Sequence, residues 1–322
     1  MSLDLERAPA SWISSMANMG IGTWAMGGPF FDGAQAVGWG PTDDEESARA
    51  LRRAVELGVT LFDTADVYGT GHAEELLGQV FAGRRDEIRI ATKWGNVFDP
   101  ATRQMTGGDG SVAYMRKALT ESLRRLRTDH VDIYQLHLGD LPFNQAAELR
   151  DALDDLVLEG LIRAYGWSTD DPERAKTFGS YVQAEMNVLH DRPDMYPVLE
   201  DHDLTMLCRG PLAMGLLTGR DWASASLPDD DVRNKVPGWM QFFRDGKPTP
   251  AFVERVEAVR EVLTSGGRTL TQGALAWIWA RCERAVPIPG CRTVAQVEEN
   301  VGALEFGPLK PDELAEVQRL LG

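Results

Sequence analysis

The 322-residue sequence has few cysteines and no long apolar run, and both absences exclude classes of protein. Its three cysteines, Cys208, Cys282 and Cys291, are scattered and form no CxxC pair. This pattern argues against a disulfide framework and a structural zinc site, and it favours a reducing compartment. No apolar run reaches the roughly 20 residues that are needed to cross a bilayer. We therefore expect a cytoplasmic protein without a membrane-spanning segment.

Positive charge is also scarce, because 33 Lys and Arg stand against 49 Asp and Glu, which gives a formal net charge of −16. This imbalance disfavours nucleic acid and anionic membranes as partners. The five histidines show no HxxxH spacing, so no metal site is expected. The first residues, MSLDLERAPASW, lack a basic stretch and an apolar core, so we expect no signal peptide. The oligomeric state is left open.

Short apolar runs alternate with longer amphipathic stretches, as in proteins with buried parallel strands. The expected strands are 19–24, 60–66, 88–94, 131–137, 164–168, 182–187, 204–208 and 285–289. The expected helices are 45–57, 111–127, 145–158, 172–178, 250–264, 272–281 and 294–304, followed by a C-terminal helix over 311–321. Eight alternations without a linker predict one α/β domain over residues 1–322, folded as a (β/α)8 barrel.

A doubly wound sheet is the alternative fold, and it usually carries GxGxxG after its first strand. Here the corresponding run is GIGTWAMGG, with Trp24 and Ala25 where the motif needs conformational freedom. We therefore discount a dinucleotide fingerprint. At the start of the first helix, Thr42-x-x-Glu45 has the spacing of a capping box.

Residues 221–249 interrupt the alternation, with mixed polarity and no clear period. A loop of this length inside a compact domain is usually functional or disordered. Because the segment contains Trp239, Met240, Phe242 and Phe243, we interpret it as a lid over the mouth of the barrel. A flexible surface excursion is the alternative.

Titratable side chains lie at the ends of three neighbouring strands. Asp63 lies in the end of the second strand, which Tyr68 follows, and Lys93 and His137 lie in the ends of the third and the fourth. Each has a structural explanation when it is taken singly, as a cap, a packed ring, a snorkelling side chain or a satisfied core histidine. The catalytic residues of a barrel lie at the carboxyl ends of its strands, so their joint position favours one site.

A carbonyl group that accepts a hydride gains negative charge on its oxygen and needs a proton. Tyr68 can supply that proton, and we expect the ammonium of Lys93 to lower the pKa of the phenol from its ordinary value near 10. Asp63 would fix the position of the ammonium. A neutral His137 could donate a hydrogen bond to the substrate oxygen and orient it.

Six sequence runs appear in a fixed order between about residues 19 and 304, and together they resemble the aldo-keto reductase superfamily. They are FDTADVYGTGHAEELLG, ATKWG, LRRLRTDHVDIYQLH, GWST, PLAMGLLTG and IPGCRTVAQVEEN. The opening GTWAMGG resembles the bacterial branch related to general-stress reductases and channel β-subunits. The resemblance implies a barrel, NADPH as cofactor and the reduction of small-molecule aldehydes or ketones. It also places Asp63, Tyr68, Lys93 and His137 on the catalytic tetrad of the family.

The same resemblance assigns a cofactor site. Ser168 and Gln183 match residues that bind the nicotinamide carboxamide, and Thr169 stands where the family often has Asn. Arg209 replaces an aromatic ring that stacks on nicotinamide, as a planar guanidinium can also do. The loop that resembles the pyrophosphate site contains Leu212, Gly215, Thr218, Gly219 and Arg220. The residues that resemble the adenosine site are Gly290, Arg292, Thr293, Gln296, Glu299 and Asn300.

The preference for NADPH is expected at the start of the helix 294–304. Thr293-x-x-Gln296 reads as a capping box, and a 2′-phosphate there would meet free backbone N–H groups together with Arg292. Gln296 replaces an arginine that is common elsewhere in the family.

Aromatic residues are candidates for the substrate pocket. Trp24 and Trp94 end strands and Trp239 lies in the long loop, so we expect these three to form pocket walls, with packing as the alternative. The alternative function is a regulatory subunit that binds NADPH and turns over slowly. We favour the enzyme, since no appended interaction tail is evident.

Overall fold

The structure is a computed structural model that describes residues 18–234 and 238–322. The expectation of no signal peptide in MSLDLERAPASW lies outside the described residues, as do positions 235–237 of the expected lid. Among the described residues, no helix is long and apolar enough to span a membrane.

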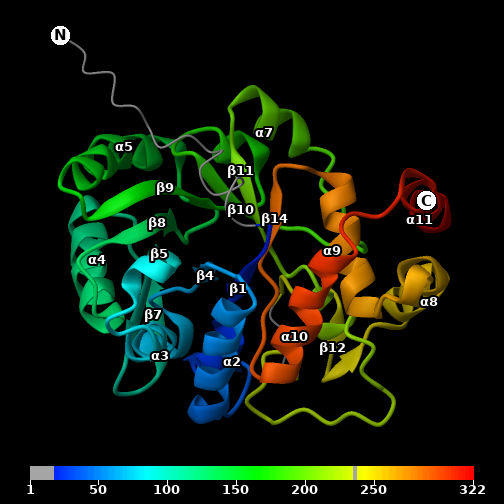
Figure 1. Cartoon of the computed structure of the whole chain (residues 1–322). Coiled ribbons are helices and arrows are strands. Elements are labelled where there is room, and N and C mark those ends of the chain that lie inside the picture. Colours follow the sequence, from blue (N-terminus) through cyan, green and yellow to red (C-terminus); the bar gives the residue numbers. More distant parts are fainter. Residues whose placement is uncertain (1–17, 235–237) are drawn as a thin grey trace.

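Eight parallel strands form a nearly closed barrel, in agreement with the predicted fold (Figure 1). In spatial order they are β1 (Gly20–Gly22), β4 (Leu61–Asp63), β5 (Arg89–Trp94), β8 (Val131–Leu136), β9 (Ile162–Ser168), β10 (Tyr181–Glu185), β11 (Thr205–Arg209) and β14 (Ala285–Pro287). A parallel bridge between Gly22 and Gly290 joins the last strand region to the first, and the Gly22 N–H donates to the Pro289 carbonyl at 3.0 Å. Each strand overlaps an expected one, and its ends lie within three residues of the expected ends.

Helices surround the barrel (Figure 1). They are α2 (Asp44–Glu56), α3 (His72–Val80), α4 (Val112–Leu126), α5 (Phe143–Leu158), α6 (Pro172–Ala175), α7 (Tyr196–Asp201), α8 (Pro250–Leu263), α9 (Leu270–Arg281), α10 (Val294–Gly302) and α11 (Pro311–Leu321). The prediction omitted α3 and α7, which are only nine and six residues long. The expected Thr42 capping box is wrong: the Asp43 side chain, one residue later, accepts the Glu46 N–H at 3.0 Å, and Asp caps helices at least as well as Thr.

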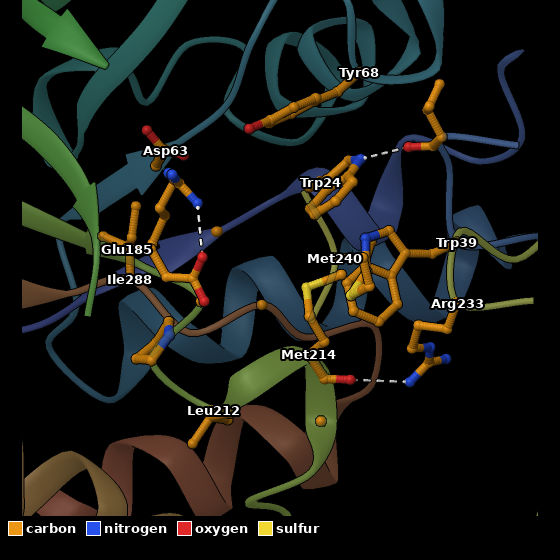
Figure 2. Close-up of a pocket in the computed structure, with 18 of the residues that line it drawn as sticks. Trp24, Trp39, Asp63, Tyr68, Glu185, Leu212, Met214, Arg233, Met240 and Ile288 are labelled. Atoms are coloured by element: carbon orange, nitrogen blue, oxygen red, sulfur yellow. Dashed lines mark hydrogen bonds and ion pairs between the residues drawn. The ribbon is translucent and has the colours of Figure 1, made fainter. Parts of the chain in front are cut away.

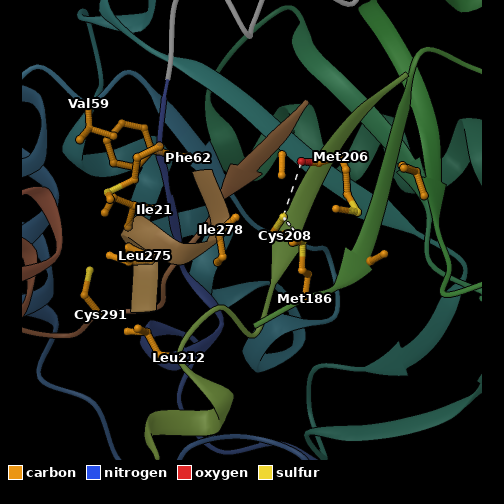
Figure 3. Packing of buried hydrophobic residues seen from close by; sticks show 14 of the residues in the cluster. Ile21, Val59, Phe62, Met186, Met206, Cys208, Leu212, Leu275, Ile278 and Cys291 are labelled. Carbon is orange, nitrogen blue, oxygen red and sulfur yellow. Dashed lines mark hydrogen bonds between the residues drawn. The ribbon is translucent and has the colours of Figure 1, made fainter. Parts of the chain in front are cut away.

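The apolar residues fall into an inner and an outer core because successive strand side chains point to opposite faces. The inside of the barrel is filled by Leu61, Ala91, Ile133, Ala164, Tyr181, Leu207, Val286 and Ile288. The larger core lies between the strands and the helices, where Ile21 and Phe62 share one cluster with Leu275 and Ile278 of α9 (Figure 3).

Small strands that the sequence did not predict lie outside the barrel. One sheet contains β2 (Phe31–Asp32), β3 (Gln35–Ala36), β6 (Asn96–Asp99) and β7 (Gln104–Gly108), and a hairpin pairs β12 (Phe243–Arg244) with β13 (Lys247–Pro248). Strands of two residues are too short to show an alternating pattern. The hairpin lies within the segment 221–249, so this part of the expected lid has regular structure.

A substitution at Gly273 tests how closely the outer helices α8 and α9 pack against each other. A Cβ at Gly273 in α9 would lie 2.0 Å from the Leu263 carbonyl oxygen at the end of α8. We expect Gly273→Ala to lower the free energy of unfolding by about 1–3 kcal/mol, because α8 and α9 would have to separate. Urea unfolding measures the change. Gly139→Ala is the matched control, since its Cβ would meet only the Ser168 oxygen at 3.6 Å, and an equal loss in both variants would contradict the packing argument.

Candidate active site

A cavity of about 580 Å³ contains three of the four predicted catalytic side chains in its lining, those of Asp63, Tyr68 and His137. Asp63 ends β4, Tyr68 lies in the loop after it, and His137 directly follows β8. The cavity therefore lies at the carboxyl ends of the barrel strands, where barrel enzymes carry their chemistry. Lys93 of β5 lies behind this surface and is 0% exposed.

Lys93 joins the members of this group through hydrogen bonds. Its Nζ donates to Asp63 Oδ2 at 2.8 Å, to the Thr64 carbonyl at 2.7 Å and to the Tyr68 hydroxyl at 3.3 Å. On the far side of the carboxylate, Gln183 Nε2 donates to Asp63 Oδ1 at 2.7 Å. A buried ion pair is tolerated only when its geometry is good and its remaining polar atoms are satisfied, and this one meets both conditions.

The loop that carries Tyr68 has an unusual backbone. Gly69, Thr70 and Gly71 all have positive φ, at 60°, 54° and 106°. A Cβ at Gly69 would lie 1.8 Å from the Gly27 carbonyl oxygen, so glycine is required for the loop to dock against the segment after β1. The loop thus fixes the position of the phenol relative to β1 and β4.

A second buried ion pair, which the sequence reading missed, anchors the same loop from behind. Glu74 of α3 is fully buried, accepts from Arg125 Nε at 2.7 Å and accepts from the Thr92 hydroxyl at 2.6 Å. Thr92 precedes Lys93 on β5, so this network ties α3 to the strand that carries the lysine. Two glutamates, Glu74 and Glu75, follow Gly71, and the sequence pattern does not indicate that one of them is buried.

Electrostatics at the phenol differ from the sequence expectation. Burial raises the pKa of Tyr68, and the ammonium of Lys93 offsets this only in part. The expectation of a net lowering is therefore wrong, because the loss of hydration on burial outweighs the nearby charge. The phenol is protonated at neutral pH, as a proton donor must be. Burial lowers the pKa of Lys93, but Asp63 and Tyr68 together more than offset this, so the net pKa of Lys93 is raised and the ammonium is retained.

His137 is held neutral. Burial, followed by the charges of Lys93 and Arg209, lowers the pKa of this imidazole well below its ordinary value. Its ring stands edge-on to Tyr68, with ring centroids 6.0 Å apart, and its Nδ1 is buried without a hydrogen-bond partner among the described residues. A neutral imidazole beside the phenol can bind the oxygen atom of a ligand between them.

Most residues of the expected cofactor site line the same cavity. They are Ser168, Thr169, Gln183, Arg209, Leu212, Gly215, Thr218, Arg220, Gly290, Arg292 and Gln296. Four expected residues are not among the described residues that line it. Thr293 caps α10, Asn300 is buried within α10, the Glu299 carbonyl accepts from Gln272, and Gly219 lies beside Thr218.

The start of α10 differs from its prediction. Thr293 Oγ1 accepts the Gln296 N–H at 3.3 Å, but the Gln296 side chain accepts from the Arg292 N–H at 2.8 Å and does not close a box on Thr293. The Val294 N–H donates to Glu46 Oε1 at 2.9 Å. The N–H groups of Arg292, Val294 and Gln296 thus already have acceptors within the protein. The expectation of free N–H groups at this helix start is wrong for these three groups.

Arg209 takes part in a charge cluster that the sequence reading did not predict. Its guanidinium pairs with Asp170, which follows β9, and with Glu185 at the end of β10, at 3.4 Å. Arg192 pairs with the same Asp170 at 3.1 Å. These partners lie in three different loops or strand ends, which is why their proximity has no signature in the sequence.

Tryptophans form one wall of the cavity (Figure 2). Trp24 stacks on Tyr68 with centroids 6.0 Å apart, and it contacts Trp39 at 5.3 Å and Trp239 at 6.2 Å. Trp239 is 56% exposed, and Trp39 is a wall residue that the prediction omitted.

Trp94 does not belong to this wall, so its assignment to the substrate pocket is wrong. It is 0% exposed and stacks on Tyr134 in the outer core, with centroids 6.0 Å apart. The reason is strand alternation: Lys93 points into the barrel, so its neighbour points outward.

The described parts of the segment 221–249 border the cavity through Trp222, Arg233 and residues 239–242. Arg233 is buried, pairs with Asp231 at 2.7 Å and lies 4.6 Å from the centroid of the Trp39 ring. Its Nη1 also donates to the Met214 carbonyl at 3.2 Å (Figure 2). The segment thus covers one side of the barrel mouth, and a closing motion stays a prediction. No group of three His, Cys, Asp or Glu that could hold a metal occurs among the described residues.

Comparison with known proteins identifies the class of protein to which this fold and site belong. A model of the aldo/keto reductase family matches residues 18–321. The chain therefore belongs to the aldo/keto reductase family.

Individual relatives cover most of the chain. It is 32% identical to the uncharacterized oxidoreductase YqkF of Bacillus subtilis, over 86% of this chain and 88% of the relative. The aldo-keto reductase yakc [NADP(+)] of Schizosaccharomyces pombe is also 32% identical, over 83% and 80%. The NADH-specific methylglyoxal reductase of Escherichia coli is 29% identical, over 91% of both chains. Among solved structures, an aldo/keto reductase from Klebsiella pneumoniae in complex with NADP and acetate is similar with a TM-score of 0.66 and 26% identity, over 94% of this chain and 91% of the other.

The pKa of His137 leads to a prediction for stability. A histidine with a depressed folded pKa binds its proton in the unfolded chain first, so it costs stability as the pH falls below the unfolded value near 6.5. We expect His137→Asn to lose less free energy of unfolding between pH 7.5 and pH 5 than the wild type does. Urea unfolding at both pH values measures this. A parallel loss in both proteins would show that the imidazole titrates normally in the folded state.

Proposed function

We propose that the protein is an oxidoreductase that uses NADPH to reduce aldehydes or ketones to alcohols. The observation that carries this proposal is the ammonium of Lys93, which is hydrogen-bonded to both Asp63 and the Tyr68 hydroxyl beside a neutral His137. This arrangement offers one proton donor and one hydrogen-bond donor to the same ligand oxygen. The three cysteines are unpaired, which supports a cytoplasmic location.

The cavity fits a nicotinamide dinucleotide in its polar groups. Ser168 and Gln183, near the tetrad, offer a hydroxyl and an amide to the carboxamide group, and His137 Nδ1 is buried there without a partner. Arg220 and Arg292 line the same cavity and supply positive charge for phosphates. One relative is named for NADP(+) and one solved structure contains NADP, whereas another relative is named NADH-specific, so the choice between the coenzymes needs its own test.

Ser168, Gln183, Arg220 and Arg292 would hold NADPH, which when bound would supply a hydride for the carbonyl carbon of the substrate. Tyr68 transfers its phenolic proton to the carbonyl oxygen as negative charge develops there. Lys93 stabilises the phenolate that remains, and Asp63 and Thr64 hold the lysine in place. His137 donates a hydrogen bond to the same oxygen and orients the carbonyl group.

The tryptophan wall indicates which carbonyl compounds fit. Trp24, Trp39 and Trp239 present flat apolar faces next to Tyr68, and such faces favour small apolar or aromatic substrates. Measuring the rate of reduction of a panel of aldehydes and ketones would identify the preferred substrate within this class.

Tyr68→Phe tests the role of the phenol as acid. We expect it to lower kcat for carbonyl reduction by roughly 100- to 10,000-fold, because the proton donor is removed while Lys93 and Asp63 remain. The rate is measured from the loss of reduced-nicotinamide absorbance with a panel of aldehydes and ketones. Coenzyme affinity, measured by quenching of tryptophan fluorescence, should change by less than about twofold, since a ring of the same shape remains.

Unchanged turnover in Tyr68→Phe would exclude this residue as the proton donor. Tight NADPH binding by the wild type without turnover of any carbonyl compound would instead favour a regulatory subunit that senses the coenzyme.

A further inference from the structure

The start of α10 lies beside α2, although the two helices are about 250 residues apart in the sequence (Figure 1). Arg53 of α2 pairs with Glu298 of α10 at 2.9 Å, and Glu46 of α2 accepts the Val294 N–H at 2.9 Å. Arg292 and Gln296, on either side of Val294, both line the cavity. A carboxylate from α2 thus sits at the end of α10 that borders the cavity.

Glu46 is ionised at this position. Its hydrogen bond from the Val294 N–H and its pairing with Arg49 lower the pKa of the carboxyl group. Its side chain is 24% exposed, and the Arg49 Nε donates to Oε2 at 3.0 Å. The contact to Val294 therefore places one carboxylate oxygen where the N–H groups and the dipole of α10 would otherwise attract an anion, while Arg49 pairs with the other oxygen.

The positive charge at this end of the cavity comes from arginines. Burial lowers the pKa of Arg292, and the nearby charges of Arg233 and Arg220 lower it further, with Asp231 acting in the opposite direction, so other guanidinium groups lie close to Arg292. Arg292 Nη1 donates to the Trp39 carbonyl at 3.3 Å, which holds this guanidinium beside the cavity. An anion at this end would be attracted by the positive charges of Arg292 and Arg220 and repelled by the negative charge of Glu46.

NADPH and NADH differ only in the 2′-phosphate on the adenosine ribose, so a charge that acts on this group alone changes the ratio of the two affinities. We propose that Glu46 weakens binding of the 2′-phosphate and thereby narrows the preference for NADPH over NADH, while Arg292 and Arg220 supply that preference. This inference rests on the proposed function, because it requires the adenosine end of the coenzyme to lie at α10. It makes Glu46 a specificity-determining residue that acts through charge and touches neither the tetrad nor the substrate.

Calorimetric titration of the protein with NADPH and with NADH tests the proposal without any turnover. Glu46→Gln removes the charge and keeps an oxygen that can accept the Val294 N–H. We expect it to bind NADPH about three- to tenfold more tightly at low salt and to bind NADH within about twofold of the wild type, as Coulomb's law gives for one charge near a phosphate in a partly solvated site. Adenosine 2′,5′-bisphosphate and AMP, used as probes in the same way, isolate the phosphate from the rest of the coenzyme.

Glu45→Gln is the matched control, because it removes an equal charge from the preceding position of α2, where the side chain is exposed. It should leave the ratio of the two affinities unchanged. The gain in Glu46→Gln should also shrink as salt is added, because added ions screen the charge. If Glu46→Gln unfolds, Arg49→Gln keeps Glu46 but removes its charge partner, and NADPH should then bind more weakly relative to NADH.

Equal changes for both coenzymes in Glu46→Gln, or the same gain in Glu45→Gln, would overturn the role of Glu46. So would an unchanged affinity for adenosine 2′,5′-bisphosphate. A wild type that binds both coenzymes and reduces carbonyl compounds would leave the proposed function standing in each of these cases. A wild type that binds neither coenzyme would overturn the proposed function as well.

Discussion

The ammonium of Lys93 has no access to water and must be neutralised and hydrogen-bonded by the protein itself. Asp63 supplies the opposite charge, the Thr64 carbonyl supplies a second acceptor, and Gln183 holds the other oxygen of the carboxylate. These partners come from β4 and β10, so the charge on β5 fixes the relative positions of three strands. The hydroxyl of Tyr68 completes the set of acceptors, which is why the position of the reactive group follows from satisfying the lysine.

Charged and aromatic side chains are distributed unequally over the lining of the cavity, and different parts of the lining therefore suit different parts of a ligand. Near Tyr68 one wall is aromatic, with Trp24 and Trp39 in edge-on contact, and the charge of Asp63 is matched by Lys93. Toward α10 the lining contains Arg220 and Arg292. Arg209 also lines the cavity, and it is paired with Asp170 and Glu185, so its charge is largely balanced. A molecule that carries an apolar reacting end and an anionic tail would bind in only one direction.

The sequence predicted the barrel and its reactive rim because both depend on local patterns. Eight apolar runs gave the strands, and the polar residues that follow them fall at one end of the barrel by topology alone. Strand alternation would also have placed Trp94 correctly, since the inward direction of Lys93 fixes the outward direction of its neighbour. The helix α3 was not predicted, because nine residues are too few to show a clear helical period.

Contacts between distant segments could not be predicted in this way. Glu46 and Val294 are 248 positions apart, and the partners of Arg209 lie on separate strand ends. The direction of the pKa shift of Tyr68 could not be predicted for a related reason. The neighbouring charge of Lys93 can be inferred from a motif, but the loss of hydration that raises the pKa depends on every residue that packs around the ring.

Arg233 gives the segment 221–249 an anchor that is independent of its tip. The guanidinium is buried among Trp39, Trp222 and Phe243 and is tied to Asp231 and to the Met214 carbonyl. Trp239, six positions further on, is largely exposed and still reaches the ring of Trp24. A substitution of Trp239 can therefore change the wall of the cavity without loosening the attachment of Arg233 to the barrel. The shape of the aromatic wall can thus be altered at Trp239 while the barrel and the Lys93 network keep their positions.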